Sequence, residues 1–270
     1  MTNAILARHR AAEVIAAEAA ALALDYFHRR ADLVIEAKAS PQDIVSRADR
    51  EVEDLIRARV AVRFPQDGYM GEEGGTQVGS SGFIWVIDPI DGTSPYLAGL
   101  PHWCVAIAVL HHGETVLGVT HAPMAAEVFS AIKGGGVTLN RQPISLGEKL
   151  TLVTSLTGIG ASHRNDLVVV GRVITGLLAA GGAFYRNGSG AIMLASVAAG
   201  RLGAYFEPHM NAWDCLGGLL MVREAGGVTA PFCGDGDFAK GGPVLAAAPG
   251  VWPDVLSIIR ASGTPLPANV

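Results

Sequence analysis

The sequence predicts a fold of the α/β class, with an α+β arrangement in its N-terminal half and an α/β arrangement in its C-terminal half. In the first half, two helical patterns precede a series of short apolar runs separated by turn residues, which is typical of an antiparallel meander. From about residue 151, strand patterns alternate with helical patterns. We therefore expect two sub-domains, residues 1–147 and residues 148–270, with the join near 145–151.

Two helices are expected at the start of the chain. Residues 3–29 are rich in alanine, the best helix former, and carry apolar residues that can form one surface. A short strand is expected at 33–37, followed by a polar break. Apolar residues then recur at helical spacing from about 43 to 63, and this second helix should end before Pro65.

Strands dominate the next part of the chain. Residues 68–75 are expected to form a strand that runs into a glycine-rich turn, and the apolar run after Gly82 predicts a buried strand. Asn140-Arg141 indicates a last hairpin turn. Between the buried strand and this hairpin turn, three further apolar runs, at 104–110, 115–121 and 127–132, predict an antiparallel meander.

In the C-terminal half, predicted strands alternate with predicted helices. Strands are expected at 151–156, 183–186, 202–206 and 243–248. Helices are expected at 165–180, 190–199, 213–225 and 251–261. This alternation is the pattern of an α/β arrangement.

Composition excludes several functional classes. Half of the 270 residues are hydrophobic and only 17% are charged, so the chain can bury a substantial core. A net charge of −5 without a cluster of Lys and Arg argues against a nucleic-acid polymer as partner. No charge-free segment is long enough to cross a membrane, and charged residues interrupt the N-terminal apolar stretch that a signal peptide would need. Three widely spaced cysteines indicate reduced thiols, so we expect a soluble cytoplasmic protein.

The most informative stretch is an apolar run that ends in Asp88, Pro89, Ile90, Asp91, Gly92 and Thr93. A carboxylate at the exit of a buried strand is costly unless a positive group meets it. Between Lys38 and Lys133, the basic residues are five arginines confined to 47–63. The unbalanced negative charge therefore favours a divalent cation, in a metal site that handles phosphate.

Further acids extend this set. Glu72 and Glu73 lie in a turn between glycines, and alone such a pair is most often exposed to solvent. Asp214 lies where a helix is expected to begin, a position at which an acid also stabilises the helix, and that role is compatible with metal binding. Mg²⁺ prefers oxygen ligands, and two ions about 4 Å apart can share one carboxylate, which would be Asp88.

The residues after Asp88 suit a phosphate. The carbonyl of Ile90 can serve as a metal ligand, and Gly92 lets the backbone approach a ligand closely. If a helix begins at Thr93, the amides of Gly92 and Thr93 would hold a phosphate.

Three rival motifs do not match. Asp88 and Asp91 lack the Asp-x-Asp spacing of the haloacid dehalogenase phosphatases, which argues against a phospho-aspartate mechanism. Asn187 stands where a nucleophile elbow needs glycine, so we interpret Ser189 as a turn residue or helix N-cap. The run 134–136 lacks the lysine of a phosphate loop. The scattered histidines show no ligand spacing, and we interpret them as surface or core residues.

Three separated motifs resemble those of the inositol monophosphatase family, in the family's order: Gly71-Glu72-Glu73, the run Trp85 to Thr93, and Trp213-Asp214 followed by Glu224-Ala225-Gly226-Gly227. Weaker similarity extends the match to about residues 33–250. The resemblance implies a layered αβαβα sandwich like that of inositol monophosphatase and fructose-1,6-bisphosphatase. It also implies two or three Mg²⁺ ions, lithium sensitivity and commonly a homodimer.

The resemblance further implies roles for individual residues. Glu72, Asp88 and the Ile90 carbonyl would hold the first metal ion, and Asp88, Asp91 and Asp214 the second. Glu72 would also activate the attacking water. The other implied roles are water activation by Thr93, phosphate binding by Gly92 and Thr93, contacts with the alcohol part of the substrate by Gly188, Ser189, Gly190, Glu207 and Asp214, and support from Lys38, Asp43, Asp49 and Glu73.

The chain departs from the family in places that would shape the substrate mouth. Ser94-Pro95-Tyr96 and Asn211-Ala212 differ from the commonest forms, and Gly190 leaves less side chain over the leaving group. Pro95 removes one backbone amide.

We therefore predict a phosphoric monoester hydrolase that uses Mg²⁺ and a metal-activated water, with an inositol-1-phosphate-like substrate. Histidinol phosphate, a 3′(2′),5′-bisphosphate nucleotide and fructose 1,6-bisphosphate are alternatives that keep the same chemistry. An alternative of another class is a non-catalytic phosphate- or metal-binding protein on the same scaffold. The presence of every implied ligand and of Thr93 argues against it.

Overall fold

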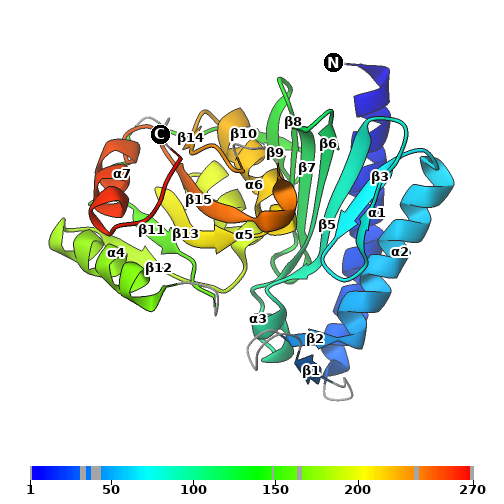
Figure 1. The fold of residues 1–270 in the computed structure, drawn as a ribbon, viewed down its shortest axis with the longest axis horizontal. Coiled ribbons are helices and arrows are strands. Elements are labelled where there is room, and N and C mark those ends of the chain that lie inside the picture. The colour runs from blue at the N-terminus through cyan, green and yellow to red at the C-terminus, as the bar shows by residue number, and fades with distance from the viewer. Residues whose placement is uncertain are drawn as a thin grey trace.

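The computed structural model describes residues 2–30, 35–37, 44–147, 149–162, 166–233 and 237–267. Figure 1 shows five layers in the order helices, sheet, helices, sheet, helices. This is the αβαβα sandwich that the resemblance implied. The inner helices lie between the two sheets, and each sheet is covered on its outer face by one further helical layer.

The outer layer on the N-terminal side consists of α1 (Asn3–His28) and α2 (Arg47–Arg63). Alanines along one face of α1 are buried, so the helix packs closely against α2 and the neighbouring strands. Ile15, Phe27, Ile56, Trp85 and Trp103 belong to the core that these two helices form with the sheet. A small antiparallel pair, β1 (Ile35–Ala37) and β2 (Ile44–Ser46), precedes α2.

The larger sheet has eight strands, in the order β10-β9-β8-β7-β6-β5-β3-β4. β3 and β5 are parallel, and the other neighbouring pairs are antiparallel, as a meander requires. The strands are β3 (Gly68–Gly71), β4 (Gly75–Gln77), β5 (Phe83–Asp91), β6 (Cys104–His111), β7 (Glu114–Ala122), β8 (Glu127–Ile132), β9 (Gly136–Leu139) and β10 (Gln142–Ile144). A short helix, α3 (Thr93–Leu97), follows β5, and a 3₁₀ turn (Pro123–Ala125) follows β7.

The smaller sheet has five strands, in the order β12-β11-β13-β15-β14. β11 is parallel to both of its neighbours, whereas β15 is antiparallel to β13 and β14. The strands are β11 (Leu156–Ile159), β12 (Ala183–Tyr185), β13 (Ala204–Met210), β14 (Val228–Thr229) and β15 (Gly242–Ala247).

Two pairs of helices flank this smaller sheet (Figure 1). The inner pair, α5 (Gly190–Ala198) and α6 (Ala212–Glu224), packs between the two sheets. The outer pair is α4 (Leu167–Ala179) and α7 (Trp252–Ala261). A 3₁₀ turn, Phe238–Lys240, precedes β15. Among the described residues, no helix is both long and apolar enough to cross a membrane.

Most expected elements are confirmed, but several boundaries were wrong. The expected helix from 43 begins at Arg47, because Ser46 and Asp49 form a capping box there and the preceding residues pair as β2. The strand and glycine-rich turn expected within 68–75 are confirmed, since β3 ends at Gly71 and a tight turn leads into β4. The strand expected at 202–206 begins at Ala204 and extends to Met210, where it still pairs with β15.

The strand expected at 151–156 was also wrong. Residues 152–154 form a turn, and β11 starts only at Leu156. The Thr154 hydroxyl accepts a hydrogen bond from the Thr151 amide at 3.1 Å, and the Ser155 hydroxyl donates to the Thr151 carbonyl at 2.7 Å. These local side-chain contacts stabilise a turn at the expense of strand pairing.

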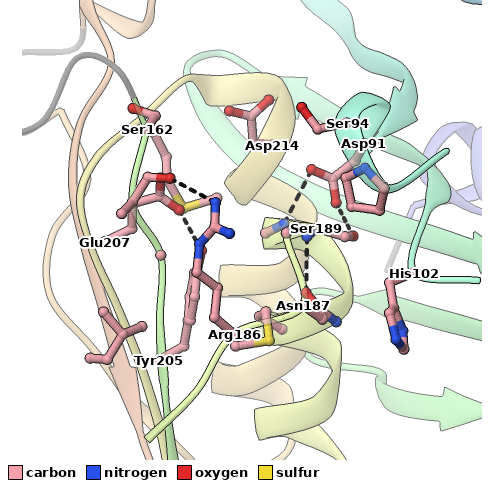
Figure 2. A pocket seen from close by; sticks show the side chains of 18 of the residues that line it. Asp91, Ser94, His102, Ser162, Arg186, Asn187, Ser189, Tyr205, Glu207 and Asp214 are labelled. Atoms are coloured by element: carbon pink, nitrogen blue, oxygen red, sulfur yellow. Dashed lines mark hydrogen bonds between the residues drawn. The ribbon is translucent and has the colours of Figure 1, made fainter. Parts of the chain in front are cut away.

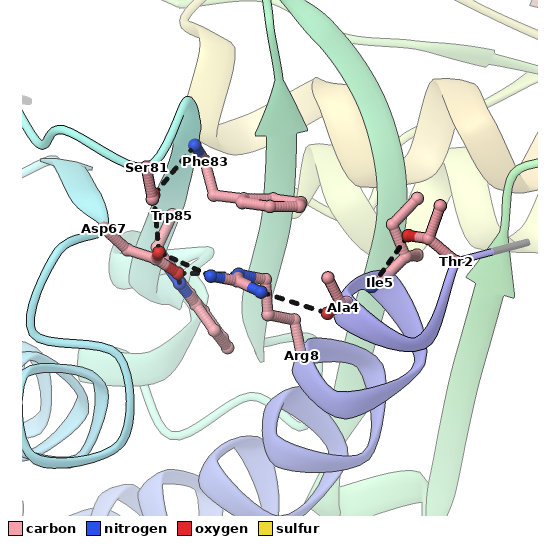
Figure 3. Close-up of polar contacts among 8 residues, drawn as sticks. All are labelled: Thr2, Ala4, Ile5, Arg8, Asp67, Ser81, Phe83 and Trp85. Carbon is pink, nitrogen blue, oxygen red and sulfur yellow. Dashed lines mark hydrogen bonds and ion pairs between the residues drawn. The ribbon is translucent and has the colours of Figure 1, made fainter.

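An ion pair fastens α1 to the larger sheet (Figure 3). Arg8 donates through Nε and Nη2 to the two carboxylate oxygens of Asp67, at 2.8 and 2.7 Å. Its guanidinium lies 3.7 Å from the ring centroid of Phe83. Ser81 and Trp85 donate to the same carboxylate at 2.7 and 2.8 Å, so the buried charge of Asp67 is fully hydrogen-bonded.

Candidate metal and substrate site

Three carboxylates from two distant parts of the chain converge on one point. Asp88 and Asp91 lie at the end of β5, and Asp214 lies in the first turn of α6. Each contributes a carboxylate oxygen, and these oxygens all lie within 4.8 Å of one another. The structure thus brings together the three side chains that the resemblance assigned to the second metal ion.

An irregularity in β5 explains how Asp88 and Asp91 reach the same site. Side chains three positions apart on a regular strand point to opposite faces. The pairing of β5 with β6 shifts register between these two aspartates, in a stretch that includes Pro89, which has no amide to donate to the ladder. The amide of Ile90 donates to Asp88 Oδ1 at 2.9 Å and holds that carboxylate in place.

The electrostatics of the three acids favour a cation. Burial raises the pKa of Asp88 well above its usual range, and the charges of Glu72, Asp91 and Asp214 raise it further. Burial likewise raises the pKa of Asp214, followed by the charges of Asp91 and Glu72. A divalent cation bound by these oxygens would replace the lost hydration and neutralise the repulsion, so the donor set fits a hard metal ion.

Asp91 is held by the start of α5. Ser189, the N-cap of this helix, donates its hydroxyl proton to Asp91 Oδ2, and the amides of Gly190 and Ala191 donate to the carboxylate at 3.2 and 2.8 Å. Burial raises the pKa of Asp91, while these hydrogen bonds lower it. The N-cap role expected for Ser189 is confirmed. Its contact with Asp91 links the larger sheet to the inner helix α5 and was not expected from the sequence.

Asp214 also caps its own helix. The amide and side-chain nitrogen of Asn211 donate to Asp214 Oδ2 at 3.1 and 3.3 Å. This confirms the expectation that Asp214 serves as a first-turn acid. The contacts engage one carboxylate oxygen, Oδ2, and fix the orientation of the side chain.

Glu72 lies at the edge of this group. It follows β3, and its amide donates to the carbonyl of Ile87 at 3.3 Å, one residue before Asp88. Its charge raises the pKa of both Asp88 and Asp214, so its carboxylate is close to the cluster. Among the described residues, however, the group within 4.8 Å consists of the three aspartates and does not include Glu72.

The hydroxyl of Thr93 is anchored on two sides. It lies 3.1 Å from the carbonyl of Ile90 and 3.3 Å from Asp49 Oδ1, both of which can accept its proton. Asp49 is buried on α2, and its other oxygen accepts from the amide and hydroxyl of Ser46 at 2.8 and 2.7 Å. Burial raises the pKa of Asp49, and the charge of Glu73 contributes to the rise. The Thr93 hydroxyl therefore brings together the Ile90 carbonyl and the Asp49 carboxylate.

Gly92 connects β5 to α3 with a backbone that suits glycine. Its φ is 91°, in the left-handed region, and a Cβ there would lie 2.7 Å from the carbonyl of His102. The expectation that a helix begins at Thr93 is confirmed, although α3 spans only five residues.

A pocket of about 910 Å³ opens next to Asp91 and Asp214 (Figure 2). Its lining also includes Glu207, Tyr205 and Arg186. The remaining lining residues are Ser94, Pro95, Ala98, Leu100, His102, Ile159, Gly160, Ala161, Ser162, Asn187, Gly188, Ser189, Gly190, Met193 and Met210. The volume lies within the range of small-molecule sites.

The residues that the resemblance places around the alcohol part of the substrate line this pocket, whereas the implied phosphate contacts, Gly92 and Thr93, are not among its lining residues. Gly188, with a φ of 92°, packs against Pro95, where a Cβ would be 2.8 Å from the ring. At Gly190 a Cβ would lie 2.3 Å from Met210 Cε, so a larger residue would displace the methionine. The departures from the family at Pro95 and Gly190 therefore both lie on the lining of this pocket.

Glu207 has a perturbed ionisation. Burial raises the pKa of its carboxyl to about 7, although the hydroxyl of Tyr205 donates to it and Arg186 is nearby. Gly160 leaves room for this pair, since a Cβ there would lie 2.0 Å from Glu207 Oε2. At neutral pH the carboxyl is divided between its two protonation states, so it can both donate to and accept from an alcohol hydroxyl.

Several site residues were not identified from the sequence. Tyr205, Arg186 and Cys104 are next to predicted site residues, and His102, interpreted from the sequence as a surface or core histidine, lines the pocket. They have no spacing motif of their own and are brought to the site by the fold alone. Two predicted supporting residues, Lys38 and Asp43, lie outside the described residues.

Comparisons with known proteins agree with this geometry. The model of the inositol monophosphatase family matches residues 7–261. A protein from Mesorhizobium japonicum named inositol-1-monophosphatase is 36% identical over 212 residues, covering 76% of this chain and 79% of that protein. A protein from Xylella fastidiosa named Nus factor SuhB is 39% identical over 197 residues, covering 72% of this chain and 71% of that protein.

Solved structures show the same architecture. The crystal structure of extragenic suppressor protein suhB from Bartonella henselae superposes with a TM-score of 0.87 at 28% identity, covering 95% of this chain and 98% of that one. Mycobacterium tuberculosis SuhB superposes with a TM-score of 0.77 at 31% identity, covering 96% and 98%.

Proposed function

Because the chain belongs to the inositol monophosphatase family, a family of metal-dependent phosphomonoesterases, we propose that it hydrolyses an inositol-1-phosphate-like substrate with Mg²⁺ as its metal. The observation that carries the proposal is the convergence of Asp88, Asp91 and Asp214 at the end of a pocket large enough for a small phosphorylated alcohol.

The donor set suits Mg²⁺. Asp88, Asp91 and Asp214 would hold one ion, and Asp88, Glu72 and the Ile90 carbonyl would hold another, so that Asp88 is shared. Bound there, Mg²⁺ would lower the pKa of a coordinated water and neutralise charge on the phosphoryl oxygens.

The remaining groups act on the water and the phosphate. Glu72 accepts a proton from the attacking water, and the Thr93 hydroxyl orients it. The carboxylate of Asp49 accepts a hydrogen bond from the Thr93 hydroxyl, and this contact favours one orientation of the lone pairs on the Thr93 oxygen. The amides of Gly92 and Thr93 are the proposed contacts to the phosphate oxygens. Hydrolysis of a phosphomonoester depends mainly on such positioning and charge stabilisation.

Specificity for the alcohol is assigned to the pocket residues around Glu207. Glu207, held by Tyr205, would bind a hydroxyl of the leaving group, together with Gly188, Ser189 and Gly190. Histidinol phosphate, a 3′(2′),5′-bisphosphate nucleotide and fructose 1,6-bisphosphate use the same chemistry and remain alternatives. Glu207 could also pair with the amine of histidinol phosphate.

A panel assay tests the proposal. Release of inorganic phosphate from myo-inositol 1-phosphate, histidinol phosphate, adenosine 3′,5′-bisphosphate and fructose 1,6-bisphosphate is measured with MgCl₂ and with EDTA. We expect Mg²⁺-dependent release, inhibited by Li⁺, with the highest kcat/KM for inositol 1-phosphate. If no substrate is hydrolysed while MgCl₂ still raises the melting temperature, the chain is a non-catalytic metal-binding protein, which is the alternative of the other class. We also propose that the protein is a homodimer and that it is located in the cytoplasm.

A further inference from the structure

The turn that carries Glu72 is fixed by three consecutive backbone amides. The amide of Glu72 donates to the Ile87 carbonyl at 3.3 Å. The next amide, that of Glu73, donates to Glu53 Oε2 at 2.8 Å, and the amide of Gly74 donates to Glu53 Oε1. Both oxygens of one side chain, Glu53, therefore hold the two residues that follow Glu72.

Glu53 is buried on α2, with only 2% of its surface exposed. It lies four positions after Asp49, so the two carboxylates lie on the same face of the helix, one turn apart. Asp49 contacts the Thr93 hydroxyl, and Glu53 holds the turn after Glu72. One face of α2 thus supports both residues to which we assign water activation.

The turn is packed closely around the Glu53 carboxylate. A Cβ at Gly71 would lie 2.6 Å from Glu53 Oε1, and a Cβ at Gly74 would lie 2.6 Å from the same oxygen. The Tyr69 hydroxyl is next to this carboxylate, and its pKa is raised by burial and by the charge of Glu53. This explains why glycine occupies the positions on both sides of Glu72 and Glu73, because a side chain at either position would push the Glu53 carboxylate away.

We propose that Glu53 is a positioning residue for Glu72: by accepting from two consecutive amides, it fixes the turn so that the Glu72 carboxylate meets Asp88. The register supports this, since Gly71 pairs with Ile87 across β3 and β5, which places Glu72 beside Asp88. The inference rests on the proposed function of Glu72 as metal ligand and base.

The substitution Glu53→Gln isolates the contact. A carboxylate has two acceptor oxygens, whereas glutamine has one and turns an NH₂ group toward the other amide. The volume is almost unchanged, so the main effect is loss of one of the two turn contacts.

The experiment compares Glu53→Gln with the parent enzyme by kcat, KM, the Mg²⁺ concentration for half-maximal activity, and the rise in melting temperature caused by MgCl₂. The last readout does not depend on turnover. We expect the Mg²⁺ midpoint to rise by about 10- to 100-fold, as for other residues that orient metal ligands. The Mg²⁺-induced rise in melting temperature should shrink, and KM for the phosphomonoester should change by less than about 3-fold, because Glu53 is outside the pocket.

Three variants make the result specific. Glu51→Gln is the matched control, because Glu51 is on the same helix but pairs with Arg47 and Tyr26, and it should behave as the parent. Ile56→Val controls for lost stability, since it trims the buried core of α2 without touching the turn. Glu53→Asp replaces Glu53→Gln if the latter does not fold. It keeps the charge but shortens the reach, and it should raise the Mg²⁺ midpoint in the same direction.

An unchanged Mg²⁺ midpoint and thermal shift in Glu53→Gln, or in Glu53→Asp where that variant replaces it, would overturn the inference. Glu72→Gln separates this result from failure of the proposed function. If Glu72→Gln loses Mg²⁺ activation while the Glu53 variants retain it, only the role of Glu53 is wrong. If Glu72→Gln also keeps parental Mg²⁺ activation, the assignment of Glu72 itself is wrong.

Discussion

The hydroxyl of Ser189 donates a hydrogen bond to Asp91, although the two residues are 98 positions apart in the chain. Asp91 ends a strand of the larger sheet, and Ser189 begins a helix that packs between the sheets. The position of the Asp91 carboxylate in the acidic cluster therefore depends on how α5 packs against the larger sheet.

Replacing Ser189 with alanine should weaken both metal binding and the fold. Loss of the N-cap should lower the free energy of unfolding by about 1 kcal/mol, and loss of the hydroxyl should raise the Mg²⁺ midpoint by about 10-fold. Thermal unfolding and Mg²⁺ activation measure the two effects. Asp166→Ala is the control, because Asp166 caps α4 through the Val168 amide at 2.8 Å, away from the site. It should lose stability but keep the parental Mg²⁺ midpoint, and an equal change in both variants would contradict the role of Ser189.

Glu207 should make stability depend on pH. Its folded-state pKa of about 7 is above the usual 4.5, so the folded state binds more protons than the unfolded state between these values. Stability should therefore fall as pH rises through this window, by up to about 3 kcal/mol. In Glu207→Gln this contribution is absent, so the difference between parent and variant, measured by urea unfolding in EDTA, should change steadily from pH 4.5 to 7. Glu114→Gln, at an exposed position, should show no such difference, and a flat difference for Glu207→Gln would refute the prediction.

Arg8 should stabilise the fold far more than a surface arginine. Its side chain and that of Asp67 are 11% and 1% exposed. Burial opposes ionisation of Asp67, but the hydrogen bonds from Arg8, Ser81 and Trp85 lower its pKa below the usual value. Arg8→Met would leave a buried charge without its cation, and we expect a loss of about 3–5 kcal/mol in urea unfolding at pH 7.

The matched control for Arg8 is Arg59→Met. Arg59 pairs with Glu18, and their side chains are 50% and 36% exposed. Such a pair contributes about 0–1 kcal/mol. Equal losses for the two variants would show that the buried pair has no special role in fastening α1.

Local patterns in the sequence were sufficient to predict most helices and strands and the acidic set, and the resemblance to the inositol monophosphatase family implied how the layers are arranged. Apolar runs and helical spacing identify the elements, and Asp88, Asp91 and Asp214 each follow a recognisable motif. The start of α2 could also have been found, since Ser46 and Asp49 have the spacing of a capping box.

Contacts between distant segments could not be predicted in this way. Nothing in the residues around Ser189 indicates that its hydroxyl meets Asp91, and nothing around Glu53 indicates that it accepts from the turn after Glu72. Such contacts depend on how the helices dock on the sheets. The turn at Thr151 was missed for a different reason, because side-chain hydroxyls there replace strand pairing.

The central claim is that the buried carboxylates form a metal site for phosphomonoester hydrolysis, and Asp88→Asn tests it most directly. Asparagine keeps the oxygen that accepts from the Ile90 amide, so the variant should fold, whereas it removes the charge that the metals would share. Phosphate release from inositol 1-phosphate is measured over a range of MgCl₂ concentrations for both proteins. We expect Mg²⁺-dependent release in the parent and a loss of at least about 1000-fold in Asp88→Asn, from the charge stabilisation that a metal ion supplies. Equal Mg²⁺-dependent rates in the two proteins would contradict the claim.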